Sequence, residues 1–299
     1  MSVERTSVLL AGGVSERVLA RSTRDGARVQ IRHGAYADQA AVGAVGRHRQ
    51  LLAGTWPLLG SGSVLSHATA AVLIGLPVWA EQLDRVSVIH NGGGHGKRSR
   101  YLHVRRDFLV DTEIGEVDGY RVTSLERTAI DVARASNYRR AVAVMDAALR
   151  AGADPELLSG IVGAAFGRVG VLVARNALSF ADARSESVGE SFSRVTMAEL
   201  ELPPPLLQFE VWRHGIWIAR VDFAWPQFGV IGEFDGRIKY QGPPDEVADV
   251  VMREKRRHEA IEEAGWDVVR WGWRELQDPP RFRSRIANAL EAGARRQAA

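Results

Sequence analysis

The sequence predicts a multidomain protein of mixed α/β (α+β) class. Its 299 residues are more than one ordinary hydrophobic core accommodates, which favours two or three domains. Six of the eight tryptophans fall after residue 170, and this change in composition indicates a separate C-terminal core. Amphipathic segments with helical periodicity alternate with short apolar runs typical of strands. We therefore expect three domains, with boundaries at residues 1–45, 46–168 and 169–299.

The bulk composition is that of a globular protein without membrane spans. Hydrophobic residues make up 45% of the chain and charged residues 25%, and the formal net charge is +3. No apolar run is long enough for a membrane helix, so we expect no membrane partner. The chain contains no cysteine, which excludes disulfides and thiolate chemistry and agrees with a cytoplasmic location.

The first domain is predicted to be a winged helix-turn-helix. In the segment SERVLARSTRDG, Ser15 is a candidate helix N-cap and Gly26 a candidate residue just after the helix. One side of this amphipathic helix is expected to carry Val18, Leu19 and Ser22, and the other side Arg17, Arg21 and Arg24. A basic strand pair follows, in which Val29 and Ile31 alternate with polar residues. Residues 1–50 carry eight arginines against four acidic residues, a balance that favours a polyanion. A helix followed by a basic hairpin is the layout of a DNA-binding winged helix. The alternative is a solvated arginine face on a small helical cap.

The middle domain is predicted to be α+β and shows no catalytic pattern. Helices are expected in LSHATAAVLIGLP, where Gly75 and Pro77 end the helix, and in TSLERTAIDVARAS and YRRAVAVMDAALRAG. Strands are expected in RVSVIH and YLHVRR. The glycine-rich NGGGHGKRS between these strands lacks the spacing of a phosphate-binding P-loop, so we expect a hairpin there. A linker, AAFGRVGVLVARNALSFADARSE, is expected to lead to the last domain.

The last domain is predicted to follow the order α-β-β-β-α-β, with acidic residues on neighbouring strands. Asp222 lies in an apolar strand, and Glu233 and Asp235 share one face at the end of the next strand. A carboxylate in a buried strand is costly unless it is paired or binds a metal. Oxygen ligands alone favour Mg²⁺ or Mn²⁺ over zinc. The alternative is that Asp222 pairs with Arg220 or Arg237 and the other two acids flank a turn.

Two stretches carry a resemblance to a known family. VDFAWPQFGVIGEFDGRIKY and REKRRHEAIEEAGWDVVRWGW resemble the nuclease-like domains related to very-short-patch repair endonucleases, of the PD-(D/E)XK superfamily. The resemblance covers about residues 185–285 and implies a restriction-endonuclease-like core with Asp222 and Glu233 as metal ligands. It also implies a role for Glu190 on the preceding helix, for which the alternative is an ion pair with Arg194.

One departure from the superfamily pattern concerns its lysine. Asp235 stands two residues after Glu233, where the superfamily has that lysine. Lys239 is a candidate replacement, and the basic helix offers Arg253 and Arg256, which could reach the DNA groove. His258 is a further catalytic candidate, for which the alternative is a buried structural histidine. The departure leaves open whether the core is catalytic.

The N-terminal half resembles a second family. HGAYAD, LSHATAAVLIGL and VTSLERTAIDVARA resemble AbiEi-type antitoxins of toxin–antitoxin systems, over about residues 8–150. That resemblance implies a DNA-binding winged helix and a toxin partner protein, with DNA contacts from Arg17, Arg21, Arg24, Arg28 and Arg32. Two functions are therefore predicted. The first is a metal-dependent DNA endonuclease recruited by its winged helix, and the alternative is a non-catalytic regulator of the antitoxin type.

Overall fold

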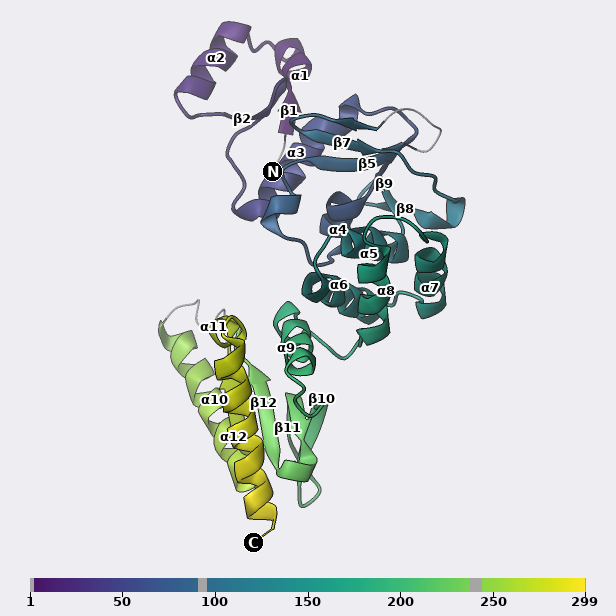
Figure 1. Cartoon of the computed structure of the whole chain (residues 1–299). Helices are drawn as coiled ribbons and strands as arrows, with labels where there is room; N and C mark the ends of the chain where they lie inside the picture. The colour runs from purple at the N-terminus through teal and green to yellow at the C-terminus, as the bar shows by residue number, and fades with distance from the viewer. Residues whose placement is uncertain (1–2, 91–95, 237–243, 299) are drawn as a thin grey trace. The chain divides into compact units, whose positions relative to one another are not determined.

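The computed structural model describes residues 3–90, 96–236 and 244–298. The chain forms two compact units of mixed α/β structure (Figure 1). Unit 1 comprises Met1–Ser136 and Ala153–Arg175, and unit 2 comprises Asn137–Gly152 and Asn176–Ala299. The predicted multidomain α/β class is confirmed at this level, and the boundaries of the three expected domains stay predictions. Within the described ranges no helix has the length and apolar character needed to cross a membrane.

The N-terminal part of unit 1 is a small antiparallel sheet with two helices. Ser15 Oγ accepts a hydrogen bond from the Val18 N–H (3.3 Å), and Gly26 follows the helix with φ +75°, so both predicted ends of the helix are confirmed. Val18 is 56% exposed and does not lie on the buried side, in contrast to Leu19. The strand order is β1-β3-β2. The elements are β1 (Val3–Arg5), α1 (Thr6–Ala11), α2 (Glu16–Arg24), β2 (Val29–Arg32) and β3 (Ala35–Ala37).

The rest of unit 1 consists of a six-stranded sheet, with the strand order β6-β7-β5-β4-β9-β8, and the helices that accompany it. Gly75 (φ +89°) ends α4 as the sequence predicts. The elements are α3 (Gly43–Thr55), β4 (Ser63–Leu65), α4 (His67–Ile74), η2 (Ala80–Gln82), β5 (Val86–His90), β6 (Lys97–Arg98), β7 (Leu102–Arg105), β8 (Ile114–Val117), β9 (Tyr120–Thr123), α5 (Leu125–Arg134) and α7 (Pro155–Ala164).

The predicted hairpin between β5 and β7 is wrong. These two strands pair in parallel, with Val86 opposite Leu102, and the antiparallel partner of β7 is the short strand β6. Parallel neighbours cannot be joined by a tight hairpin. Of the connecting segment NGGGHGKRS, residues 91–95 lie outside the described residues.

Unit 2 contains a four-stranded sheet, β10-β11-β12-β13, in which only the β12–β13 pair is parallel. The succession α9, β10, β11, β12, α10, β13 has the predicted α-β-β-β-α-β order. The segment expected as a linker contains α8 (Val171–Phe180). The other elements are α6 (Tyr138–Arg150), α9 (Val188–Glu199), β10 (Leu206–Arg213), β11 (Ile216–Trp225), β12 (Val230–Phe234), α10 (Pro244–Glu263), β13 (Asp267–Trp271), α11 (Trp273–Leu276) and α12 (Pro279–Gln297).

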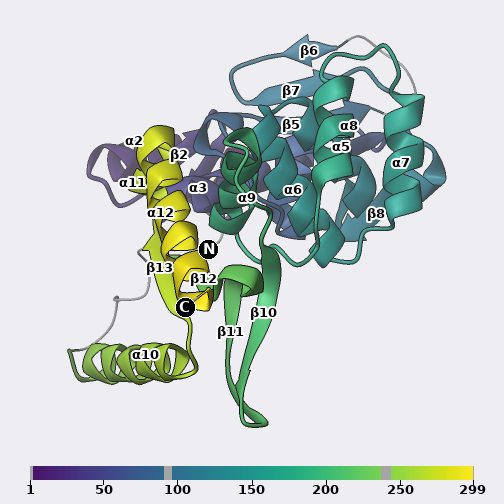
Figure 2. The same cartoon turned by 60° about the horizontal axis from the view of Figure 1, so that its bottom comes forward.

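Large aromatic side chains fill the core of unit 2. Trp225 and Trp271 pack with α12 in one cluster, whereas Ala224 and Ile231 belong to a second cluster that includes Ile261 of α10. Gly232 lies between the two tryptophans, and a Cβ there would come within 2.5 Å of the Trp271 ring. The β10–β11 hairpin extends beyond β12 and β13 (Figure 2).

Candidate active site

Neighbouring strands place Asp222 and Glu233 together. Strands β11 and β12 are antiparallel with Phe223 opposite Gly232, and the same register continued by one residue sets Asp222 opposite Glu233. On the other side of β12, Glu233 pairs with Arg270 of the parallel strand β13. Directly opposed residues point to the same face of a sheet. Three charged side chains therefore form a row across β11, β12 and β13.

These side chains line a hollow of about 230 Å³, which we call the acidic hollow. Its described lining holds four carboxylates and two guanidinium groups, an excess of two negative charges (4 − 2). The lining consists of Asp222, Glu233, Phe234, Asp235, Glu254, Arg257 and Arg270.

Asp222 is fixed by the backbone of the adjacent strand. Its Oδ2 accepts a hydrogen bond from the Phe234 N–H at 2.9 Å. Charge-assisted bonds of this kind are stronger than neutral ones and hold the carboxylate in one orientation. Arg220, the partner considered in the alternative, instead donates to Glu186 at 2.9 Å. Arg237, the other alternative partner, lies outside the described residues.

Glu233 is buried, with 8% of its surface exposed, and two arginines bind it. Its Oε1 accepts from Arg257 (2.5 Å) and its Oε2 from Arg270 (2.9 Å). Burial alone raises the pKa of Glu233, but Arg257 and Arg270 outweigh it and hold this pKa below its usual value. Glu254 accepts from the same two arginines, at 3.2 Å and 3.0 Å.

Glu190 and His258 are not in the lining of the acidic hollow. Glu190 is buried on α9, and its Oε2 accepts from the Glu186 N–H (2.8 Å) and from Gln208 Nε2 (3.0 Å). The alternative ion pair with Arg194 does not form, because Arg194 binds Asp146 at 2.8 Å. His258 Nε2 lies 3.3 Å from Glu262, and its buried Nδ1 has no hydrogen-bond partner among the residues described.

The arginine of α10 that reaches the acidic hollow is not one of those expected from the sequence. Arg253 and Arg256 are exposed on the helix, whereas Arg257, which the sequence-based site omits, reaches Glu233. Arg257 stands four residues before the buried Ile261, so helical periodicity places it toward the sheet. Arg270 is also missing from the prediction, although a positive charge between the apolar residues Val269 and Trp271 of a strand signals it. Lys239 lies outside the described residues.

The residues present meet the needs of a divalent cation in donor type and charge. No three Asp, Glu or His side chains in the described parts of the chain form a metal centre by themselves. Mg²⁺, however, often binds through one or two carboxylates and keeps several waters. Asp222 and Glu233 supply such a pair in a hollow whose described lining has two more carboxylates than guanidinium groups. Arg257 and Arg270 would retain Glu254 as a partner if Glu233 turned to a cation.

The N-terminal arginines divide into two groups. Arg17, Arg21 and Arg24 are exposed on α2, where Arg21 pairs with Asp25 at 3.3 Å. Arg28 instead binds Glu4 (3.0 Å), and Arg32 donates to Thr55 Oγ1 (3.1 Å). Three of the five predicted DNA-contacting residues are therefore exposed, and two are held within unit 1.

Comparison with known proteins places the chain in a family. No protein-family model matches it. The crystal structure of the Rv2827c protein of Mycobacterium tuberculosis covers 71% of this chain and 84% of its own, with 18% identity and a TM-score of 0.39, too low to support a conclusion. Two uncharacterized M. tuberculosis proteins, MT2308 and Rv2248, are each 32% identical over 272 residues, which is 90% of this chain and 94% of theirs. The chain therefore belongs to the same family as the uncharacterized proteins MT2308 and Rv2248 of Mycobacterium tuberculosis.

Proposed function

We propose that the protein is a metal-dependent DNA endonuclease whose active site is the acidic hollow. The observation that carries the proposal is that Asp222 and Glu233, from neighbouring strands, line one hollow with two excess negative charges. When bound there, Mg²⁺ or Mn²⁺ would polarise a phosphodiester and lower the pKa of a water molecule. The resemblance of residues 185–285 to PD-(D/E)XK nucleases supports the same assignment.

The two arginines supply positive charge where the superfamily lysine is displaced. Arg257 and Arg270 each bind both Glu233 and Glu254, and both line the acidic hollow. Guanidinium groups bind phosphate oxygens with paired hydrogen bonds. We assign them to hold Glu233 in place and to position the scissile phosphate. Asp222, fixed by the Phe234 N–H, would then face the phosphate from the neighbouring strand.

DNA recruitment is assigned to the N-terminal part of unit 1, as a winged helix. Arg17, Arg21 and Arg24 project from α2 with their side chains exposed. Exposed arginines on one helix provide the sequence-independent phosphate contacts that hold a protein on a duplex. Linking such a helix to the acidic hollow in one chain would bring the active site to DNA.

The assay incubates the purified full-length protein with supercoiled and linear DNA, with Mg²⁺, Mn²⁺ or EDTA. We expect cleavage that requires the metal and falls by at least about a hundredfold in Asp222→Asn and Glu233→Gln, because each removes a ligand charge. Glu210→Gln changes an exposed carboxylate outside the hollow and should cleave like the wild type. Full activity in Asp222→Asn would contradict the site.

A second candidate function is a non-catalytic DNA-binding regulator of the antitoxin type, with a toxin as its protein partner. The observation that favours it is that both oxygens of Glu233 are already bound by arginines. A buried carboxylate whose charge is compensated by two arginines can have a purely structural role, without binding a metal. Sequence-selective DNA binding by the wild type, with no cleavage under any metal condition, would favour this candidate over the nuclease.

A further inference from the structure

A second hollow, in unit 1, is lined by cationic side chains and lies apart from the nuclease proposal. It has a volume of about 190 Å³ and receives residues from α4, η2, β5, β6, β7 and α5. We call it the basic hollow. Its lining includes the cationic or titratable side chains of Arg85, Arg98, Arg105, His67 and His103, together with the carboxylates Glu81 and Asp84.

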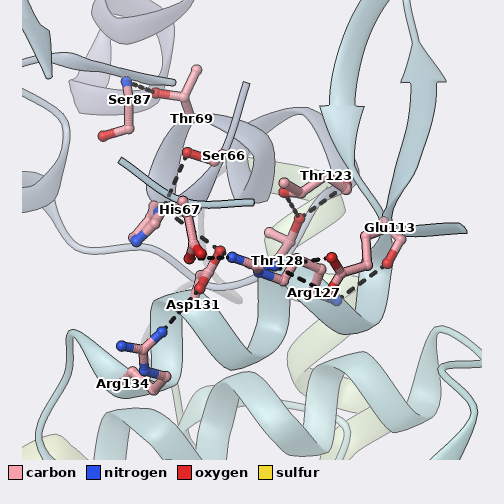
Figure 3. Close-up of polar contacts among 12 residues, drawn as sticks. Ser66, His67, Thr69, Ser87, Glu113, Thr123, Arg127, Thr128, Asp131 and Arg134 are labelled. Carbon is pink, nitrogen blue, oxygen red and sulfur yellow. Dashed lines mark hydrogen bonds and ion pairs between the residues drawn. The ribbon is translucent and has the colours of Figure 1, made fainter. Parts of the chain in front are cut away.

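The carboxylates Asp131 and Glu113, which do not line the basic hollow, form ion pairs with Arg127 and Arg134 (Figure 3). Asp131, with 2% of its surface exposed, accepts from Arg127 at 3.0 Å and lies 3.4 Å from Arg134. Arg127 also binds Glu113 at 3.0 Å and Asp107 at 2.6 Å. Asp131 therefore pairs with Arg127 and Arg134, and among the described residues it forms no ion pair with the arginines that line the basic hollow.

His67 lines the basic hollow and also lies close to Asp131. It is the first residue of α4 and has a φ of +52°, a conformation that few non-glycine residues adopt. Its Nδ1 lies 3.1 Å from Ser66 Oγ and 3.8 Å from Asp131, and its other ring nitrogen points away from them in Figure 3. When Ser66 donates to Nδ1, Nε2 carries the ring proton and is available as a donor.

Two arginines of the basic hollow have no carboxylate partner in the described structure. Arg85 pairs with Asp84 at 2.5 Å, but neither Arg98 nor Arg105 forms an ion pair with a described residue. The Nε of Arg105 is buried and has no hydrogen-bond partner there. Burial lowers the pKa of Arg105, as do Arg98 and Arg134, while Asp131 raises it. A buried donor without an acceptor is uncommon in folded proteins, because its desolvation is not compensated.

The donors around the basic hollow are those that an oxyanion needs. Guanidinium groups present several N–H donors in a plane, and His103 and Ser87 add further polar groups. A volume of 190 Å³ corresponds to roughly six times the share of one water in the liquid, which accommodates a single phosphoryl group. A longer polyanion would need an open channel, so the fit is to an end group.

We propose that the basic hollow binds a terminal phosphoryl group through Arg98 and Arg105, with His67 and His103 as additional donors. The phosphoryl group could belong to inorganic phosphate, to a 5′-mononucleotide or to the 5′ end of a nucleic acid strand. Nothing in this site depends on the acidic hollow of unit 2. The two proposals can therefore fail separately.

The test is calorimetric titration of the full-length protein with inorganic phosphate at constant ionic strength, with chloride as the reference anion. We expect saturable binding with one site per chain. Affinity should fall by about tenfold or more in Arg105→Gln and in Arg98→Gln, because each removes a charge-assisted contact. Arg47→Gln changes an exposed arginine of α3 outside the hollow and should bind like the wild type.

Three comparisons complete the test. Arg98 is exposed, so Arg98→Gln keeps the proposal falsifiable if Arg105→Gln does not fold. Asp222→Asn should retain phosphate binding even if it loses cleavage. Titration with a 5′-mononucleotide, and with an oligonucleotide with and without a 5′-phosphate, distinguishes the source of the phosphoryl group. No saturable phosphate binding by the wild type, or equal affinity in the wild type and Arg98→Gln, would overturn the proposal.

Discussion

At the scale of single residues, the ion pairs of the acidic hollow share their partners. Glu233 binds two arginines, and Arg257 and Arg270 each bind two carboxylates. Removing one partner of a buried pair costs more than the pair contributes, because the other charge stays buried. Shared partners reduce that cost. This arrangement would allow Glu233 to change partners while both arginines stay bound to Glu254.

Two buried histidines of unit 1 make its stability depend on pH. Burial lowers the pKa of His48, opposed by its hydrogen bond to Leu83, and lowers the pKa of His67 strongly, with Arg105 and Arg127 adding to the effect. The unfolded chain therefore takes up these protons first as the pH falls. The contribution of these histidines to the free energy of unfolding of unit 1 should be fully present above roughly pH 6.5. Below that pH, the free energy of unfolding should decrease by up to about 1.4 kcal/mol per pH unit for each histidine.

The variant His67→Asn tests this dependence, since asparagine tolerates the positive φ of this position. We expect a weaker pH dependence between pH 6.5 and 5 than in the wild type, with the contribution of His48 remaining. The measurement is hydrogen exchange of α4 and β5 peptides across a urea series, which separates unit 1 from unit 2. An unchanged pH dependence in the variant would refute the assignment to His67.

At the scale of elements, the local ends of helices were predictable and the pairing of strands was not. Ser15, Gly26 and Gly75 end or begin helices where the sequence predicts, because capping depends on neighbouring residues alone. The parallel pairing of β5 with β7 depends on a third strand, β6, which no local pattern revealed. Asp222 and Glu233 were found because acids are rare in apolar strands. The contacts of Arg257 and Arg270 depend on helix rotation and strand register.

Helix α2 is the element to which DNA binding is assigned. Arg17 and Arg24 are exposed on it, whereas Arg28 and Arg32 have partners inside unit 1. The double variant Arg17→Gln/Arg24→Gln should bind duplex DNA more weakly whatever the sequence. Its log–log slope of affinity against salt should be shallower by roughly one for each arginine.

Fluorescence anisotropy at four or more salt concentrations measures both quantities. Arg47→Gln is the matched control, because it removes one exposed positive charge from α3 of the same unit. Equal affinity and slope in the double variant and the wild type would show that α2 does not contact DNA.

At the scale of the whole molecule, the similarity to the two relatives extends over both units. The similarity to MT2308 and Rv2248 extends over 272 residues, which is longer than either unit. Both units therefore have counterparts in these two relatives. Such a combination agrees with a protein that binds DNA with one unit and acts on it with the other, as we propose.

The central claim is that Asp222 and Glu233 hold a divalent cation, and Mn²⁺ binding tests it without requiring the correct DNA substrate. Calorimetric titration of the wild type with Mn²⁺ should show one site per chain. Asp222→Asn should weaken binding by about tenfold or more, because it removes a charged ligand, while Glu210→Gln should not. Absence of Mn²⁺ binding by the wild type, or equal binding by Asp222→Asn, would contradict the account.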